Sequence, residues 1–235
     1  MATGTISPPP ERVPLSRPSP AVQDYLKAIY MLLESEEDPD AVATTSQVAD
    51  ALGVTAASAS NMLKRMDQLG YVDLAKRQGV GLTVEGRSAA LEVVRHHRLL
   101  ETYLVDRLGV PWDEVHREAE VLEHHISPSL GARIDAALGH PDRDPHGHPI
   151  PRPQGEVVAV EDEPLSLLAD GASGVVRQVS DHDGQLLRYL GELGLVPDAE
   201  IAVIGRKPFG GPILVAVGGR EVEVPPEAAA AVRVG

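Results

Sequence analysis

The feature that most constrains the fold is a pair of short helical patterns that flank Gly53. The first pattern covers Gln47–Leu52, and the second covers Ala56–Leu69, with Thr55 placed to cap it. The second pattern is rich in small and polar residues in its first half. Two helices joined by a tight glycine turn are typical of a helix-turn-helix, whose second helix lies in the DNA major groove.

This second helix has the composition of a recognition helix, since small polar side chains can approach base edges and cations can bind phosphates. The candidate DNA-binding residues are Thr55, Ala57, Ser58, Ser60, Asn61, Lys64 and Arg65. Two β-rich runs, Tyr71–Ala75 and Gly81–Val84, then flank a turn that contains Lys76 and Arg77. An ordinary helical hairpin could explain each piece alone, but their order favours a DNA-binding winged helix-turn-helix with a basic wing.

The composition limits the remaining possibilities. A formal net charge of −14 is a poor overall match to nucleic acid, so DNA contacts must come from a local basic face. The 43% hydrophobic content is sufficient for a core, and the lack of cysteine excludes disulfides, thiolate metal sites and cysteine nucleophiles. No stretch resembles a signal peptide or a membrane span, so we expect a cytoplasmic protein that does not bind membranes.

A second informative stretch is HREAEVLEHH, residues 116–125. In a helix, at about 100° per residue, four of its side chains fall within an arc of roughly 100°. These are His116, Glu120, Glu123 and His124. Imidazole and carboxylate groups on one stripe suit a first-row divalent metal, whereas a solvated charged face is the alternative.

The helix expected from Glu85 to the break at Gly109 carries His97 and Glu101 on one face, at i and i+4. A proline-rich loop over residues 139–153 contains three histidines, His140, His146 and His148. A histidine-rich loop can bind metal. Its prolines favour a rigid extended connection instead.

After residue 165 the pattern changes to short β-rich runs separated by glycine and proline, which predicts a small barrel. We therefore expect five segments along the chain. They are a disordered tail (1–20), a winged helix-turn-helix domain (21–93), a helical metal-binding domain (94–152), a linker (153–164) and a β domain (165–235).

The chain carries, in this order, a winged helix and the motifs HRLLE from His97, VH at His116, ExxEH from Glu120 and the loop DPHGHPIP. In this it resembles the diphtheria-toxin-repressor family of iron- or manganese-dependent transcriptional repressors, over roughly residues 21–235. The resemblance implies a mostly α N-terminal part, in which a helical dimerisation domain follows the winged helix, and a C-terminal SH3-like β-barrel. It also implies a homodimer that binds a palindromic DNA operator and represses metal-uptake genes.

Members of this family have two metal sites between the DNA-binding and dimerisation domains. By position, the resemblance assigns the primary site to Asp24, Glu120, Glu123 and His124. It assigns the ancillary site to His97, Glu101 and His116, with Gln178 and Asp181 as a looser match to two ligands from the C-terminal domain.

Iron-responsive members place methionine and cysteine where this chain has Asp24 and Glu120. Carboxylates are hard ligands that suit Mn²⁺, so the chain resembles the manganese branch, with Fe²⁺ as the alternative and Co²⁺ or Zn²⁺ able to act in vitro. Short manganese repressors carry a second acid one turn after the helix-1 aspartate. That position is Lys27 here, which argues against a coupled pair of metals built on that acid.

Three other readings compete: an iron-dependent regulator of the same family, a metallohydrolase and a metal-buffering protein. A zinc hydrolase helix needs HExxH or HxxEH, and Glu120 stands where the second motif needs histidine. A di-iron bundle needs Glu-x-x-His, but Glu123 follows Glu120 at i+3. A buffering protein would leave the winged helix unexplained. We therefore expect a regulator and not an enzyme.

Overall fold

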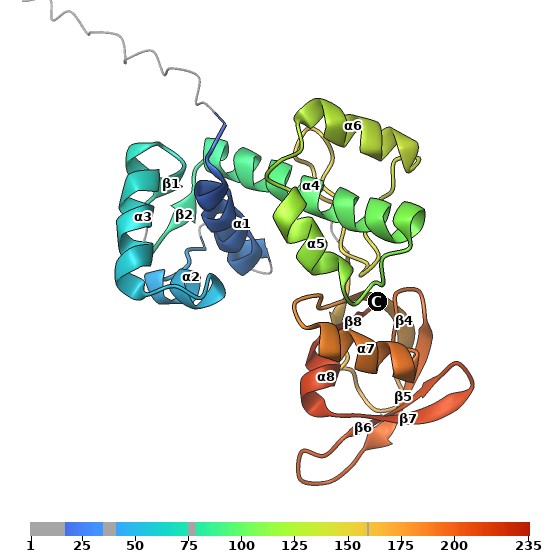
Figure 1. Cartoon of the computed structure of the whole chain (residues 1–235). Coiled ribbons are helices and arrows are strands. Elements are labelled where there is room, and N and C mark those ends of the chain that lie inside the picture. Colours follow the sequence, from blue (N-terminus) through green and yellow to red (C-terminus); the bar gives the residue numbers. More distant parts are fainter. Residues whose placement is uncertain (1–16, 35–40, 75–78, 159) are drawn as a thin grey trace, which may run out of the picture. The chain divides into compact units, whose positions relative to one another are not determined.

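The computed structural model describes residues 17–34, 41–74, 79–158 and 160–235 (Figure 1). The chain divides into two compact units, Met1–Ala90 and Leu91–Gly235, which are described separately below. Within the described residues, no helix is both long and apolar enough to cross a membrane.

The first unit contains a helix-turn-helix followed by a two-stranded wing. Its elements are α1 (Pro20–Glu34), α2 (Thr45–Ala51), α3 (Ala56–Gln68), β1 (Val72–Asp73), β2 (Gly81–Leu82) and the start of α4 (Val84–Leu108). β1 and β2 pair antiparallel, with Val72 opposite Leu82. The predicted wing residues Lys76 and Arg77 lie outside the described residues, as do residues 1–16 of the predicted tail.

Local capping explains where the two helices of the motif begin. Thr44 caps α2, and its side chain and that of Gln47 form a reciprocal capping box. The Thr55 hydroxyl accepts a hydrogen bond from the Ser58 backbone N–H at 3.2 Å and so caps α3, as the sequence predicts. The inward faces of α1, α2 and α3 supply a buried aliphatic core that includes Leu26, Ile29, Val48, Leu63 and Met66.

The second unit begins with helices. It contains most of α4, then α5 (Val115–Leu122) and α6 (Pro128–Ala137). The sequence predicts a longer helix over Trp112–Ile126, but α5 begins later and ends earlier than predicted. It also predicts the next helix over Leu130–Leu138, whereas α6 begins two residues earlier. The chain turns at His124 and His125. α6 starts earlier because Ser127 caps it and Pro128 fits the first turn, where its missing N–H is not needed.

The C-terminal part of this unit is a small antiparallel sheet with two helices. The elements are β3 (Glu163–Pro164), β4 (Ser173–Val179), α7 (Gly184–Leu193), β5 (Glu200–Arg206), β6 (Ile213–Val217), β7 (Arg220–Val224), α8 (Pro226–Ala230) and β8 (Val232–Val234). The strand order is β3-β8-β4-β5-β6-β7. The mostly helical N-terminal part followed by an SH3-like β domain is confirmed. Among the described residues β3 and β7 do not pair, so the sheet stays open rather than closing into the predicted barrel.

The β domain has a core of its own, formed by aliphatic side chains from several strands and from α7. Val176, Leu187, Val203 and Val215 are among its buried members. A loop that follows α6 packs against β4, where the Val179 N–H donates to the His146 carbonyl at 2.9 Å. The Arg143 guanidinium also donates to the Arg177 carbonyl at 3.1 Å. These bonds bring the loop close to the end of β4, where the metal-ligating candidates gather.

Candidate metal centre

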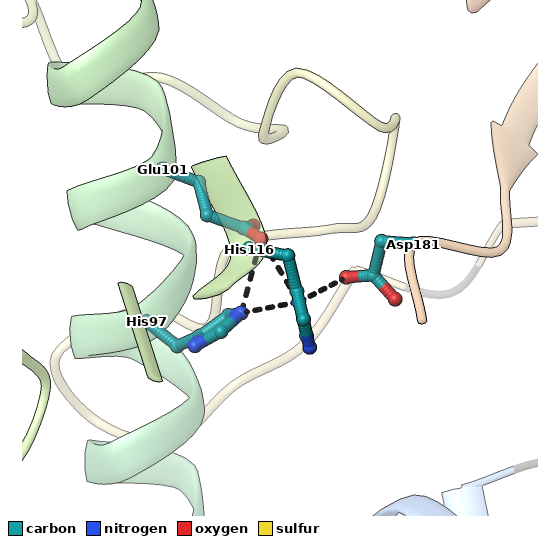
Figure 2. Close-up of side chains that lie close together, drawn as sticks. All are labelled: His97, Glu101, His116 and Asp181. Carbon is teal, nitrogen blue, oxygen red and sulfur yellow. Dashed lines mark hydrogen bonds and ion pairs between the residues drawn. The ribbon is translucent and has the colours of Figure 1, made fainter. Parts of the chain in front are cut away.

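Four of the five side chains predicted for the ancillary site lie together in the second unit (Figure 2). His97 Nε2 lies 3.0 Å from Glu101 Oε1 on α4, one turn away. His116 Nδ1, from α5, lies 3.2 Å from His97 Nε2 and 3.3 Å from Glu101 Oε1. Asp181, which follows β4, places Oδ2 3.3 Å from His116 Nδ1. We call these four residues the helix-side cluster.

The fifth predicted residue, Gln178, is not brought to this cluster. Its side-chain Nε2 donates to Asp162 Oδ2 at 3.0 Å, and Asp162 also accepts from Arg233 at 2.6 Å. Gln178 and Asp181 are three residues apart, but Gln178 belongs to β4 whereas Asp181 lies beyond its end. A ligand role for Gln178 therefore stays a prediction without geometric support.

Burial and close charged partners act together on the pKa values of the helix-side cluster. Burial alone would raise the pKa of Glu101, but His97, His116 and His146 outweigh it and hold that pKa well below the usual range. Burial would lower the pKa of His116, whereas its hydrogen bonds to Asp181 and Glu101 raise it to about 10. At neutral pH, Glu101 of the metal-free cluster is therefore ionised and His116 carries a proton.

This arrangement predicts that metal binding releases protons. A divalent ion needs neutral imidazole, so binding near pH 7 must displace a proton from His116, and the apparent affinity should rise as pH increases toward 10. Titration calorimetry with Mn²⁺ at pH 7, in buffers of different ionisation enthalpy, should detect at least one proton released per ion. Binding that is independent of pH between 6 and 9 would contradict this charge assignment.

The predicted primary-site residues of this unit lie at the C-terminal end of α5. Glu123 is fully buried, and its Oε2 lies 2.5 Å from His97 Nδ1. His124 Nε2 lies 3.6 Å from Glu123 Oε1. Glu120, whose side chain is 43% exposed, places Oε1 3.6 Å from His116 Nε2. Asp24 is on α1 in the first unit, and its membership of the site stays a prediction.

His97 faces both sets of candidate ligands, because its two ring nitrogens point to different carboxylates. Nε2 contacts Glu101 in the helix-side cluster, and Nδ1 contacts Glu123 in the primary set. The helical arc predicted for HREAEVLEHH is thus divided in the structure. His116 contacts Glu101 and Asp181, whereas Glu123 contacts His97 from the other side.

The sequence reading missed two histidines of the proline-rich loop. His146 and His148 are buried beside the helix-side cluster, with His146 Nδ1 3.7 Å from Glu101 Oε1 and His148 Nδ1 3.8 Å from Asp181 Oδ2. The structure therefore places both histidines beside the candidate ligands, which the sequence did not predict. His140, the third histidine, is largely exposed and pairs with Asp135. The sequence signal that could have indicated their position is the alternation of one acid and two histidines at residues 144, 146 and 148.

The donor set fits a divalent cation. All the side chains offer imidazole nitrogen or carboxylate oxygen, the ligands that borderline and hard divalent metals prefer. Glu101 Oε2 and His146 Nδ1 are buried and have no hydrogen-bond partner within the described part of the chain. Leaving such atoms unsatisfied is costly, and a bound cation would satisfy both.

The first unit presents the predicted recognition residues on the outer side of α3. Ala57, Ser58 and Asn61 are exposed, whereas Ser60 is half-buried. Lys64 and Arg65, one turn further along, are exposed as well. Ala59, Leu63 and Met66 are buried on the opposite side, so the apolar face packs inward and the polar face is available for DNA.

Three protein-family descriptions match successive parts of the chain. Residues 19–80 match the iron dependent repressor N-terminal DNA binding domain, and residues 83–152 match the iron dependent repressor metal binding and dimerisation domain. Residues 163–235 match the FeoA domain.

Relatives named for either metal cover nearly the whole chain. The iron-dependent repressor IdeR of Mycobacterium tuberculosis strain H37Rv is 35% identical over 222 residues, which span 89% of this chain and 94% of the relative. A solved structure of a manganese-dependent transcriptional repressor in complex with manganese is 45% identical, with a TM-score of 0.84 over 91% of this chain and 98% of that one. A third relative, the HTH-type transcriptional regulator MntR of Geobacillus kaustophilus, covers half of the chain: it is 34% identical over 117 residues, 50% of this chain and 79% of MntR. The chain therefore belongs to the diphtheria-toxin-repressor family of metal-dependent, DNA-binding transcriptional repressors, which are not enzymes.

Proposed function

We propose that this protein is a manganese-dependent repressor that binds a palindromic operator as a metal-loaded homodimer and represses metal-uptake genes. The observation that carries this proposal is the donor chemistry of the metal centre. Its gathered side chains supply only imidazole nitrogen and carboxylate oxygen, and the chain has no cysteine. Such ligands suit Mn²⁺ better than a thiolate and thioether site would. The 45% identical relative with bound manganese supports the same choice.

The primary site would link the two units of the chain. Asp24 lies on α1, which precedes the helix-turn-helix, whereas Glu120, Glu123 and His124 belong to the metal-binding domain. If all four hold one ion, the orientation of α3 is restricted relative to the dimerisation domain. In a twofold dimer this sets the separation of the two recognition helices, which must match half-sites about one DNA turn or a multiple apart. Because coupling is reciprocal, DNA should also tighten metal binding.

The test of the proposed function is a titration of operator binding with two metals. Mn²⁺ and, under anaerobic conditions, Fe²⁺ are titrated against complex formation with the promoter DNA of the chain's own gene. Mn²⁺ should activate binding at the lower free concentration. Activation by Fe²⁺ at a lower concentration than Mn²⁺ would assign this chain to the iron-dependent members, and no metal-dependent binding would contradict both.

Glu120 is the residue that we expect to decide metal preference. The Glu120→Cys variant replaces a hard oxygen donor by a softer sulfur, which should raise the Mn²⁺ concentration needed for operator binding at least tenfold relative to that of Fe²⁺. Glu118→Cys, on an exposed position of the same helix, is the matched control. An unchanged ratio of the two activation concentrations would remove Glu120 from the selectivity argument.

Asp24→Ala should reduce Mn²⁺-dependent operator affinity at least tenfold, because it deletes the only primary-site ligand proposed from the DNA-binding unit. Asp106→Ala removes an exposed carboxylate from α4 and serves as the control for charge. Band-shift titrations at fixed Mn²⁺ measure both variants. If Asp24→Ala binds operator as the unchanged protein does, the proposed link between the units is wrong.

A further inference from the structure

The turn that leads into α5 carries the only tryptophan of the chain and lies against the β domain of the same unit. Trp112 is partly buried and packs against the aliphatic core of that domain. The turn is closed by its own backbone, where the Val115 N–H donates to the Pro111 carbonyl at 3.0 Å. His116, a member of the helix-side cluster, follows Asp113 by three residues. A short closed turn therefore connects this contact surface to a candidate ligand.

Three residues of α7 face this turn. Gly184, Arg188 and Gly191 are spaced at i, i+4 and i+7, which places them on one side of the helix. A Cβ built on Gly184 would lie 2.5 Å from the Asp113 carbonyl oxygen, and one built on Gly191 would lie 3.3 Å from Trp112 Cζ2. Arg188 Nε lies 3.1 Å from Asp113 Oδ2. We call these five residues the α7 seat.

The close approach at Gly184, and not the ion pair, determines how tightly α7 fits the turn. The Arg188 side chain is 61% exposed, and exposed ion pairs contribute little to stability. At Gly184, by contrast, a methyl group would meet a backbone carbonyl, which cannot rotate away as a flexible side chain can. Alanine is the better helix former, so helix propensity gives no reason for glycine at this position. The space between α7 and the turn gives that reason.

The α7 seat lies next to the connection that carries Asp181. Gly184 follows Asp181 by three residues, so the start of α7 fixes one end of this connection. The other end is fixed to the sheet, since the Ser180 N–H donates to the Ala231 carbonyl at 2.9 Å. Between these two points Asp181 places Oδ2 3.3 Å from His116 Nδ1. The contact between the two ligand candidates therefore depends on where α7 is seated.

We propose that the α7 seat positions Asp181 for metal binding, by holding the start of α7 against the turn that precedes His116. The inference rests on the proposed function, in which the helix-side cluster binds metal. The seat residues act through Asp181 and are positioning residues, not ligands. When α7 moves off the turn, Asp181 moves away from His116. The ion then loses the charged ligand of the β domain, while the three ligands on the helices remain.

The test is a double-mutant cycle on the full chain, with Mn²⁺ affinity measured by calorimetry in the absence of DNA. Gly184→Ala should weaken Mn²⁺ binding at least tenfold, the range expected for a residue that orients a metal ligand. Asp181→Ala should weaken it at least as much. Gly184→Ala added to Asp181→Ala should lower the affinity less than twofold further, because its effect passes through Asp181. Gln185→Ala, an exposed neighbour on α7, is the matched control and should leave the affinity unchanged.

Trp112 gives a second measurement that needs no metal. Its emission comes from a single site in the chain, so it reports how the turn packs on α7. Gly184→Ala should shift the emission of the metal-free chain to longer wavelength, whereas Gln185→Ala should not. Circular dichroism and thermal melting report whether each variant folds. If Gly184→Ala does not fold, Gly191→Ala takes its place in the cycle, since its Cβ meets only a ring that can give way by a few tenths of an ångström.

The outcomes are distinct. Unchanged Mn²⁺ affinity in the seat variant, or in Asp181→Ala, would overturn the proposal. Equal losses from the seat substitution with and without Asp181 would mean that it damages the metal centre generally, and would overturn it too. If the cycle gives the expected result but Mn²⁺ does not activate operator binding by the unchanged chain, the proposed function is wrong and the positioning of Asp181 stands.

Discussion

Glu101→Gln is expected to lower the Mn²⁺ affinity of the second unit by about 100-fold or more. Loss of a residue that only hydrogen-bonds a metal ligand already lowers metal affinity by up to about 100-fold. The substitution keeps the size of the side chain and removes its charge. Glu101 is fully buried and its Oε1 lies within 3.7 Å of His97, His116 and His146. Three imidazoles therefore lie close to this one carboxylate. The loss should be larger than for any single histidine, since Glu101 contacts both His97 and His116 and removes a ligand charge that no histidine supplies.

The same variant should change the proton balance. Against the effect of burial, Glu101 and neighbouring aspartates together raise the pKa of His116 to about 10 and that of His146 to about 9. Removal of the Glu101 charge should therefore let both imidazoles lose their protons at lower pH. Mn²⁺ binding to the variant should then release fewer protons and depend less on pH. Calorimetric titration measures affinity and proton release together. Glu118→Gln, an exposed position on α5, is the matched control, and equal affinities of the two variants would remove Glu101 from the metal centre.

Gly147→Ala is expected to lower the free energy of unfolding of the metal-free protein by about 3 kcal/mol or more. Gly147 has φ +91°, and a Cβ built on it would lie 2.0 Å from the Arg177 carbonyl oxygen of β4. The loop cannot accept this atom without leaving the strand. Because His146 and His148 flank this glycine, the variant should also move their imidazoles away from Glu101 and Asp181.

Gly139→Ala is the control for this prediction. Gly139 has a similar φ, +78°, but a Cβ there meets nothing within 4 Å. Gly139→Ala should therefore lower the free energy of unfolding only by the conformational cost of a left-handed alanine, about 1 kcal/mol. Chemical denaturation of both variants gives the comparison. Equal losses would mean that backbone conformation, and not the contact with Arg177, determines the effect.

The helix pattern illustrates what local sequence can and cannot predict. The i, i+4 spacing of His97 and Glu101 predicts a shared face because both lie within one regular helix, and the structure places them 3.0 Å apart. The same reasoning extended α5 too far. His124 lies in a turn after the helix, so its approach to Glu123 depends on how the chain leaves the helix and not on helical periodicity.

The sequence by itself determined the order of elements, the capped helices of the helix-turn-helix and the residue types of the metal centre, since these depend on neighbours along the chain. Only the tertiary structure decided which donors meet. Asp181 approaches His116 while Gln178 turns to Asp162, because a strand ends between them. His146 and His148 are buried because the loop packs on β4, where Gly147 allows a close approach to Arg177. Such contacts join residues distant in the chain, and no local pattern encodes them.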